Sequence, residues 1–223
     1  MRFPECLIRL PGWIESLVPG EPVFPTFEDR MRFTVLLARM NVERKTGGPF
    51  GAAVFDRDGA LVAPGVNMVV SSGCSLLHAE IVALALAQAR TGSYDLGQGD
   101  RGPYELTASS EPCAMCLGAI PWSGVSRLVC GARDEDVRRI GFDEGHKRGD
   151  WRESLASRGV RVVRDVLRQD AVRVLELYVE TGGPIYNAGR PSNAKNRARA
   201  LNLRISACSP FHKKSTRSGR LKK

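Results

Sequence analysis

The segments His78-Ala-Glu80 and Pro112-Cys-Ala-Met-Cys116 place the strongest constraint on how this chain folds. One imidazole and two thiolates suit zinc, and three protein ligands leave the fourth tetrahedral position open for water, as in catalytic zinc sites. The carboxylate of Glu80 is then free to take a proton from that water. Any fold of this chain must bring the two segments together, and the sequence therefore predicts an open metal site in an enzyme.

A lone Cys-x-x-Cys pair has other interpretations, because it also occurs as half of a structural zinc site, as a redox pair or by chance. A closed structural site needs a fourth protein ligand. The remaining histidines and cysteines form no second pair at ligand spacing, and they are His146, His212, Cys6, Cys74, Cys130 and Cys208. A non-catalytic zinc or RNA-binding module stays an alternative, but a purely structural metal has no need of Glu80.

The composition indicates one folded domain. With 223 residues and 43% hydrophobic content, the chain can bury one substantial core. It has no run of about eighteen apolar residues, so no membrane span is expected. The first residues, interrupted by Arg9 and Pro11, make a poor secretory signal. Six cysteines, two of them needed as thiolates, fit a reducing compartment, and we therefore expect a cytoplasmic protein.

The net charge of +9 is concentrated at one end of the chain. Residues 188–223 hold eleven Lys and Arg and no acid, whereas residues 1–187 hold 22 basic and 24 acidic groups, a net charge of −2. The tail composition is typical of disorder. Such a tail either has no role or binds nucleic acid non-specifically. Residues 1–25, with five prolines, are expected to form an irregular leader, which leaves 26–187 as the folded domain.

Strands and helices alternate along the expected domain. Thr26 is a plausible N-cap for the first helix, and Ser75 is expected to cap a long helix that carries His78 and Glu80 in its first turns. Helices are expected at 27–43, 76–90, 113–124 and 170–180, and strands at 50–55, 60–70, 104–109, 127–130 and 160–163. This order predicts a three-layer α/β/α domain with a mixed central sheet, in which a parallel portion follows an opening hairpin.

The spacing of the two cysteines agrees with this arrangement. Cys113 and Cys116 are three residues apart, so on a helix they lie on one face and can hold one ion. Both are expected near the helix N-terminus, where exposed N–H groups stabilise thiolates. His78 is expected to open the neighbouring helix. Helix N-termini at the carboxyl ends of strands border the crevice in which open α/β sheets bind ligands, and we expect the site there.

Five segments also carry a family resemblance: GGPFGAAVF (47–55), GVNMVV (65–70), LHAEIVAL (77–84), SSEPCAMCLGAIPWSGV (109–125) and GFDEG (141–145). With them, residues 47–187 resemble the cytidine deaminase superfamily and, within it, the bacterial guanine deaminase branch. The zinc motifs are common to the superfamily, while GFDEG and the segment around Trp122 indicate the guanine branch. The resemblance implies a cytidine deaminase-like fold, a homodimer, one zinc ion per chain and hydrolytic deamination of a free purine base, guanine to xanthine and ammonia.

The same resemblance implies roles for individual residues. Asn67, expected on the second hairpin strand, recognises the base, Phe142 stacks on its ring, and Glu144 lies near the purine. The segment 182–187 (GGPIYN) resembles one that closes over the pocket in some members, although the basic extension after it departs from that pattern. The implied catalytic residues are Glu80 and Glu144, the metal ligands are His78, Cys113 and Cys116, and the substrate-binding residues are Asn67, Phe142, Phe50, Ala79 and Trp122.

Two other enzymatic activities stay open at this point. A tRNA adenosine deaminase shares both zinc motifs, but the near-neutral body of this chain lacks the basic excess that a tRNA reader usually presents. Only the basic tail favours that alternative. The residues also do not rank guanine against cytosine, guanosine or an amino-triazine.

Overall fold

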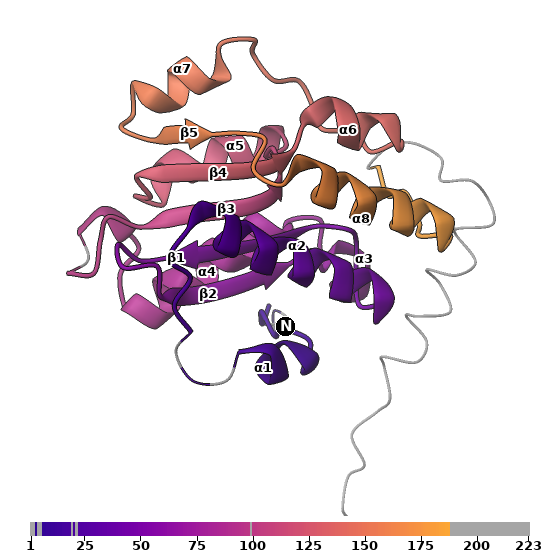
Figure 1. Ribbon diagram of the computed structural model, residues 1–223, viewed down its shortest axis with the longest axis horizontal. Helices are drawn as coiled ribbons and strands as arrows, with labels where there is room; N and C mark the ends of the chain where they lie inside the picture. The colour runs from indigo at the N-terminus through magenta and orange to yellow at the C-terminus, as the bar shows by residue number, and fades with distance from the viewer. Residues whose placement is uncertain (1–2, 4–5, 19, 21, 99, 188–223) are drawn as a thin grey trace, which may run out of the picture. The chain divides into compact units, whose positions relative to one another are not determined.

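The computed structural model describes residues 3, 6–18, 20, 22–98 and 100–187. They fold into one unit (Figure 1), and the basic tail expected at 188–223 lies outside the described residues. No helix among the described residues is long and apolar enough to cross a membrane. The elements are α1 (Trp13–Leu17), α2 (Phe27–Glu43), β1 (Gly51–Phe55), β2 (Leu61–Val66), α3 (Val69–Ser72), α4 (Ala79–Thr91), η1 (Leu96–Gln98), β3 (Glu105–Ser110), α5 (Ala114–Ala119), η2 (Ile120–Trp122), β4 (Arg127–Ala132), α6 (Asp134–Arg139), α7 (Trp151–Ala156), β5 (Arg161–Val163) and α8 (Arg168–Glu180).

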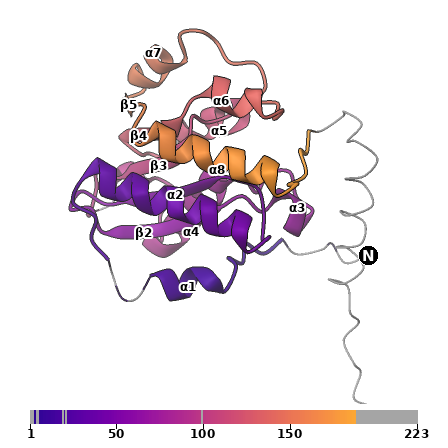
Figure 2. The ribbon, with the colours of Figure 1, turned by 45° about the vertical axis from the view of Figure 1, so that its right-hand side comes forward.

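A mixed five-stranded sheet with the order β2-β1-β3-β4-β5 forms the centre of the domain. β1 is antiparallel to both β2 and β3, whereas β3, β4 and β5 run parallel to one another. Figures 1 and 2 show α2 and α8 side by side on one face of the sheet, with α4 and α5 on the other. This arrangement confirms the predicted α/β fold with a mixed sheet and helices on both of its faces.

Both faces of the sheet are apolar, as a sheet between two helical layers requires. Every residue of β1 and of β3 is buried. On one face, Leu84 of α4 packs in a cluster with Leu106 and Leu128 of the sheet. On the other face, Met31 of α2 packs in a cluster with Val174 of α8. Fully burying an aliphatic side chain of this size stabilises the fold by roughly 1.5–3 kcal/mol.

Near the site, the structure differs from the predicted elements in the end of one strand, the start of one helix and the length of another helix. The second hairpin strand ends at Val66 rather than residue 70, so Asn67 follows β2 instead of lying on it. The helix predicted at 76–90 begins at Ala79, with His78 rather than Ser75 as its N-cap. The reason is tertiary, because the Leu77 carbonyl accepts a hydrogen bond from the Met68 N–H (2.9 Å) and is not available to a helix.

The helix predicted at 113–124 is divided into α5 and η2, because Pro121 at the start of η2 has no N–H to continue the α-helical pattern. The leader is not irregular throughout, since it contains α1. Ile14 of α1 is 2% exposed and packs with Phe33 and Leu37 of α2. Three short helices, α3, α6 and α7, were not predicted.

Candidate active site

The three expected metal ligands lie where two helices begin. His78 is the N-cap of α4, Cys113 is the N-cap of α5, and Cys116 lies inside α5. The chain enters α5 directly after β3, which runs parallel to β4, so the start of α5 lies at the carboxyl ends of these strands. The imidazole of His78 and the thiol of Cys113 face each other across the two helix starts.

The spacing of the three ligand atoms fits a zinc ion. One ligand atom from each of His78, Cys113 and Cys116 lies within 4.8 Å of the others. The Cys113 Sγ and His78 Nδ1 atoms are 3.5 Å apart. Ligands at ordinary Zn–S and Zn–N distances on a tetrahedron are separated by about 3.3–3.8 Å. The donor set is also right for this metal, since thiolate and imidazole are the ligands that zinc prefers.

The electrostatics of the two cysteines favour a thiolate at the start of α5. The hydrogen bond from Cys116, followed by that from His78, lowers the pKa of Cys113 to about 4 against the opposing effect of burial. The same bond raises the pKa of Cys116, so the two sulfurs hold one proton between them. A divalent cation replaces such a proton when it binds both sulfurs as thiolates.

Glu80 lies beside the ligands without being one of them. It occupies the first turn of α4, two residues after His78, and is 7% exposed. Burial and then the nearby Cys113 raise its pKa, while the neighbouring His78 acts in the opposite direction. The structure therefore brings together three zinc ligands and one uncoordinated carboxylate, as the sequence predicted.

Glu144 belongs to the loop between α6 and α7 and reaches the same place. Its backbone carbonyl accepts a hydrogen bond from the N–H of Ala114, the residue after Cys113 (2.9 Å). Its side chain is buried, and this burial raises its pKa to about 8 although the Lys147 ammonium acts in the opposite direction. A second carboxyl group is thus held next to the zinc ligands, in a setting that favours its neutral form.

Aromatic rings form an apolar wall around Phe142. The ring of Phe50 is 5.2 Å from that of Phe142 in an edge-on arrangement, and Tyr186 makes a similar contact at 5.0 Å. Tyr178 of α8 stacks on Phe142 at 6.0 Å. These residues come from four separate segments, so the fold, rather than local sequence, assembles the wall.

Asn67 is buried and held by hydrogen bonds of its backbone and side chain. It is 1% exposed, and its carbonyl accepts a hydrogen bond from the Asn41 side chain (2.9 Å), which also donates to the Gly48 carbonyl (2.8 Å). Residue 48 must be glycine here, since a side chain would overlap the hydroxyl of Tyr186. The Asn67 Oδ1 atom accepts from the N–H of Val69 (3.3 Å), and the amide N–H groups lie beside the hydroxyl of Tyr186.

The remaining two expected substrate contacts differ in position. Ala79, the first residue of α4, is buried directly between His78 and Glu80. Trp122 ends η2 and is 76% exposed, and the guanidinium of Arg158 lies over its ring at 5.3 Å. Its contact with substrate stays a prediction.

Tyr186 is a candidate site residue that the sequence did not single out. Its hydroxyl is buried and makes no hydrogen bond of good geometry among the described residues, although the side chain of Asn67 lies beside it and lowers its pKa. Burial raises its pKa well above the usual value, and the charges of Glu144 and Glu80 act in the same direction, which places the hydroxyl near both carboxyl groups. Only its place in the segment 182–187, expected to close over the pocket, pointed to it.

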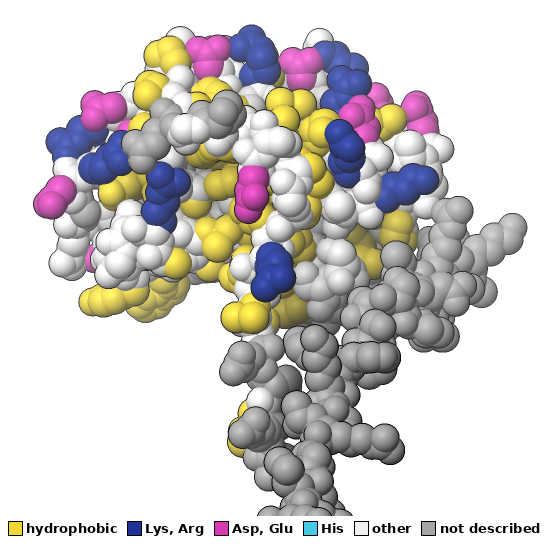
Figure 3. Space-filling model, turned by 90° about the horizontal axis from the view of Figure 1, so that it is seen from below, with side chains coloured by type: hydrophobic (Ala, Val, Ile, Leu, Met, Phe, Trp, Pro, Cys, Tyr) yellow, Lys and Arg dark blue, Asp and Glu magenta, His cyan; other side chains and the backbone are white. Residues whose placement is uncertain are grey.

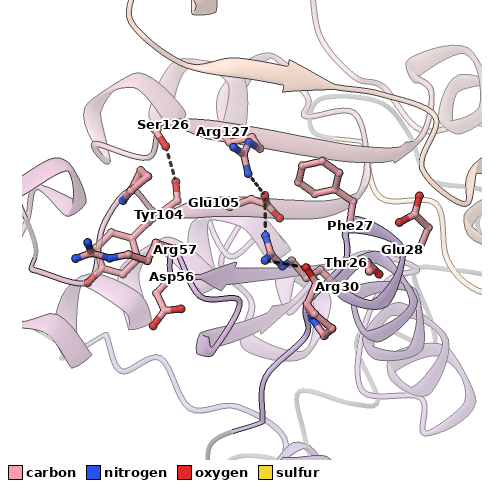
Figure 4. Close-up of a pocket in the computed structure, with 12 residues that line it drawn as sticks. Thr26, Phe27, Glu28, Arg30, Asp56, Arg57, Tyr104, Glu105, Ser126 and Arg127 are labelled. Atoms are coloured by element: carbon pink, nitrogen blue, oxygen red, sulfur yellow. Dashed lines mark hydrogen bonds and ion pairs between the residues drawn. The ribbon is translucent and has the colours of Figure 1, made fainter.

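A polar cavity lies at the opposite end of the sheet from the His78, Cys113 and Cys116 cluster. Its volume is about 400 Å³, and it is bordered by the first residues of β3 and β4 (Figure 4). Glu105 in its wall pairs with Arg30 and Arg127, each at 3.1 Å. The lining carries three arginines and three acids. Because these charges balance one another and no metal ligands gather there, the chemistry belongs to the His78 end of the molecule.

Comparison with known proteins agrees with this site. The profile of the cytidine and deoxycytidylate deaminase zinc-binding region matches residues 26–132. The guanine deaminase of Bacillus subtilis (strain 168) is 38% identical over 117 residues, which cover 52% of this chain and 71% of that protein. A solved structure of the guanine deaminase from Nitrosomonas europaea is 43% identical, with a TM-score of 0.75, over 78% of this chain and 96% of that one. The tRNA-specific adenosine deaminase of Haemophilus influenzae is 33% identical over 114 residues, 51% of this chain and 62% of that protein.

The chain belongs to the cytidine and deoxycytidylate deaminase zinc-binding family. Membership confirms the resemblance predicted from the sequence, and with it zinc as the cofactor. It also excludes the non-catalytic module as the simplest interpretation, because the relatives are enzymes and the buried Glu80 stands beside the zinc ligands.

Proposed function

We propose that this protein is a zinc-dependent aminohydrolase of purine metabolism that converts guanine and water into xanthine and ammonia. The observation that carries the proposal is the joint placement of an uncoordinated carboxylate, Glu80, beside three zinc ligands and a second buried carboxyl group, Glu144. Relatives named guanine deaminase, with 38% and 43% identity, support guanine as the substrate.

The expected metal ligands and Glu80 have separate roles in this reaction. His78, Cys113 and Cys116 would hold zinc, which supplies a Lewis acid that makes water a nucleophile near neutral pH. Glu80 accepts a proton from the water that attacks C2 of guanine and delivers it to the ring nitrogen. The proton of the new hydroxyl on C2 then passes to the exocyclic amino group, the bond between C2 and that nitrogen breaks, and ammonia leaves as the C2 carbonyl forms.

The residues around the metal ligands account for the specificity of the enzyme for a flat, polar ring such as a purine. Phe142 offers an aromatic face on which a purine stacks, and Phe50 and Tyr186 support it from the side. Asn67 presents an amide to the edge of the base away from the reacting carbon. Glu144 binds a ring N–H or carries the second proton, for which a buried carboxyl group of raised pKa is suited.

A substrate panel tests the proposal. Purified enzyme is offered guanine, guanosine, cytosine, an amino-triazine and a tRNA anticodon stem-loop, with ammonia release as the measurement. Guanine should give the highest kcat/KM. The matched control is Glu80→Gln, which keeps zinc and fold but should lose at least about 100-fold in kcat because an amide cannot accept the proton. If the stem-loop gave the higher kcat/KM, the proposed function would be wrong and tRNA adenosine deamination would take its place.

We further propose that the enzyme is a homodimer. Large apolar side chains remain exposed in several elements, which a single copy does not cover, and a second copy is the occupant that the family resemblance implies. Figure 3 shows hydrophobic side chains gathered in the middle of the face seen from below, with charged side chains around its rim. Over all faces of the described part of the chain, the most exposed large apolar side chains are Phe3, Leu7, Val23, Leu76, Tyr94 and Trp122. Sedimentation of the full-length protein tests this, and a monomer at micromolar concentration contradicts it.

The remaining expectations are also proposals. Residues 26–187 form the catalytic domain, and the five described cysteines are free, which is consistent with a cytoplasmic protein in a reducing compartment. The basic tail at 188–223, outside the described residues, binds nucleic acid non-specifically if it binds at all.

A further inference from the structure

Lys147 is a buried cation with no part in the chemistry described so far. Its side chain is 8% exposed, although lysine is almost never buried unless it is paired. The ammonium group donates to the carbonyl of Pro112 (2.9 Å) and forms an ion pair with Asp134. It also lies 3.9 Å from Oε2 of Glu144. Three N–H donors thus face three acceptors from three separate segments.

Each of these acceptors is connected to the site. Pro112 precedes the zinc ligand Cys113, and Glu144 is the second carboxyl group. Asp134 begins α6, and its N–H donates to Glu111, the residue before Pro112 (3.0 Å). The ammonium therefore lies at the one place where the GFDEG loop, the zinc loop and the start of α6 meet.

The orientation of the Glu144 side chain needs such a partner. The backbone of the loop is fixed independently, by the bond from Ala114 to the Glu144 carbonyl and by Arg138 donating to the Gly145 carbonyl (2.6 Å). Neither of these bonds touches the Glu144 carboxyl group. The Lys147 ammonium is the cationic group that lies within 4.0 Å of this carboxyl group among the described residues, at 3.9 Å from Oε2.

We propose that Lys147 is a positioning residue of the deamination reaction, which orients the Glu144 carboxyl group toward the bound base while anchoring it to the zinc loop through Pro112. The proposal rests on guanine deamination as the function and on Glu144 acting in it. Lys147 itself does not touch substrate or metal. Its effect on turnover passes through Glu144.

The test compares Lys147→Met with two other variants. Methionine keeps most of the apolar stem but removes the charge and all three donors. Lys147→Arg keeps the charge and should recover most of the lost activity. Arg148→Met is the matched control, because Arg148 is the next residue, its side chain is 78% exposed, and it pairs with Asp150 on the surface. If Lys147→Met does not fold, Lys147→Gln replaces it.

Lys147→Met should lower kcat for guanine by about 10- to 100-fold, below the full effect of losing a general acid or base, with KM changed by less than about threefold. Zinc content and the visible spectrum of the cobalt-substituted enzyme should match the wild type. In a Glu144→Gln background, the same substitution should cost less than about twofold, because the group it orients is already disabled.

Three results overturn the inference: kcat of Lys147→Met within twofold of wild type, an undiminished loss in the Glu144→Gln background, or loss of zinc. The last would show that Lys147 acts through Pro112 and the zinc loop instead. If the wild type prefers another aminated base, the ratios of kcat between each variant and the wild type are measured on that base, and they test the role of Lys147 in the same way. A wrong substrate is therefore distinguishable from a wrong role for Lys147, while a wild type that releases no ammonia refutes both.

Discussion

Replacing Tyr186 by phenylalanine should stabilise the free enzyme and impair it at the same time. The hydroxyl is buried and makes no hydrogen bond of good geometry among the described residues, its contact being with the Asn67 side chain, while the ring packs against Phe142 at 5.0 Å. Phenylalanine keeps the ring and its packing and removes only the oxygen. The hydroxyl is costly in the free enzyme, and in our proposal its partner is the polar edge of the bound base.

The structure sets the size of both effects. An unsatisfied buried hydroxyl costs about 1–3 kcal/mol, so Tyr186→Phe should be more stable by about that amount. For a folded unit of this size, each kcal/mol corresponds to about 2–4 °C in Tm, and the increase should be at least about 2 °C. A neutral hydrogen bond contributes about 0.5–1.5 kcal/mol, and its loss should lower kcat/KM for guanine by about 2- to 12-fold.

Calorimetry without substrate and steady-state kinetics with guanine measure the two effects. Tyr178→Phe is the comparison for stability, because the Tyr178 hydroxyl donates to the Pro184 carbonyl at 2.7 Å and its removal should lower Tm. Opposite signs for two tyrosines that contact the same phenylalanine exclude a general effect of losing an oxygen. A lower Tm for Tyr186→Phe together with unchanged kcat/KM would refute the reasoning.

The other predictions concern the metal, the base and the tail. Cys113→Ala or Cys116→Ala should lose zinc in metal analysis, since two remaining protein ligands form a poor site, and full occupancy in both would contradict the ligand assignment. Glu144→Gln should lower kcat for guanine with zinc retained, whereas Phe142→Ala should raise KM more than it lowers kcat, because stacking acts alike on ground and transition states. Normal turnover by Glu144→Gln would reduce GFDEG to a structural loop. Deleting 188–223 should leave guanine turnover nearly unchanged and weaken salt-sensitive binding to polyanions, and a collapse of turnover would move the domain boundary beyond Asn187.

The long elements could be predicted because each carries its own signal. The helix Phe27–Glu43 was expected with its correct bounds, and Thr26 caps it by accepting from the N–H of Asp29 (3.1 Å). The strands were expected within one residue at each end, except for the end of β2, which was expected four residues too late, and the end of β4, which continues two residues further, to Ala132. Six-residue helices such as α6 and α7 show too few turns for a periodic pattern, and their formation depends on packing.

The zinc ligands could be predicted for a related reason. Cys113 and Cys116 are three residues apart, and Glu80 is two residues from His78, so most of the metal site lies in two short segments. The residues around it do not share that property. Asn41 contacts Asn67, 26 residues away, and Lys147 contacts Pro112, 35 residues away. No local sequence pattern predicts contacts over such separations.

The start that the sequence predicted for α4 was wrong, and the reason shows how a tertiary contact changes local structure. A helix beginning at Leu76, as its apolar pattern suggests, would use the Leu77 carbonyl internally. In the structure, that carbonyl accepts from Met68, just after β2, and the first carbonyl used by α4 is that of His78, which accepts from Val82 (3.0 Å). The helix therefore starts at the metal ligand itself, and His78 has the extended backbone of an N-cap. A hydrogen bond to the segment after β2 thus sets the direction of the imidazole and places Glu80 in the first turn beside it. For this reason the identity of the site residues can be inferred from a motif. Their geometry also depends on the segment after β2, which the motif does not contain.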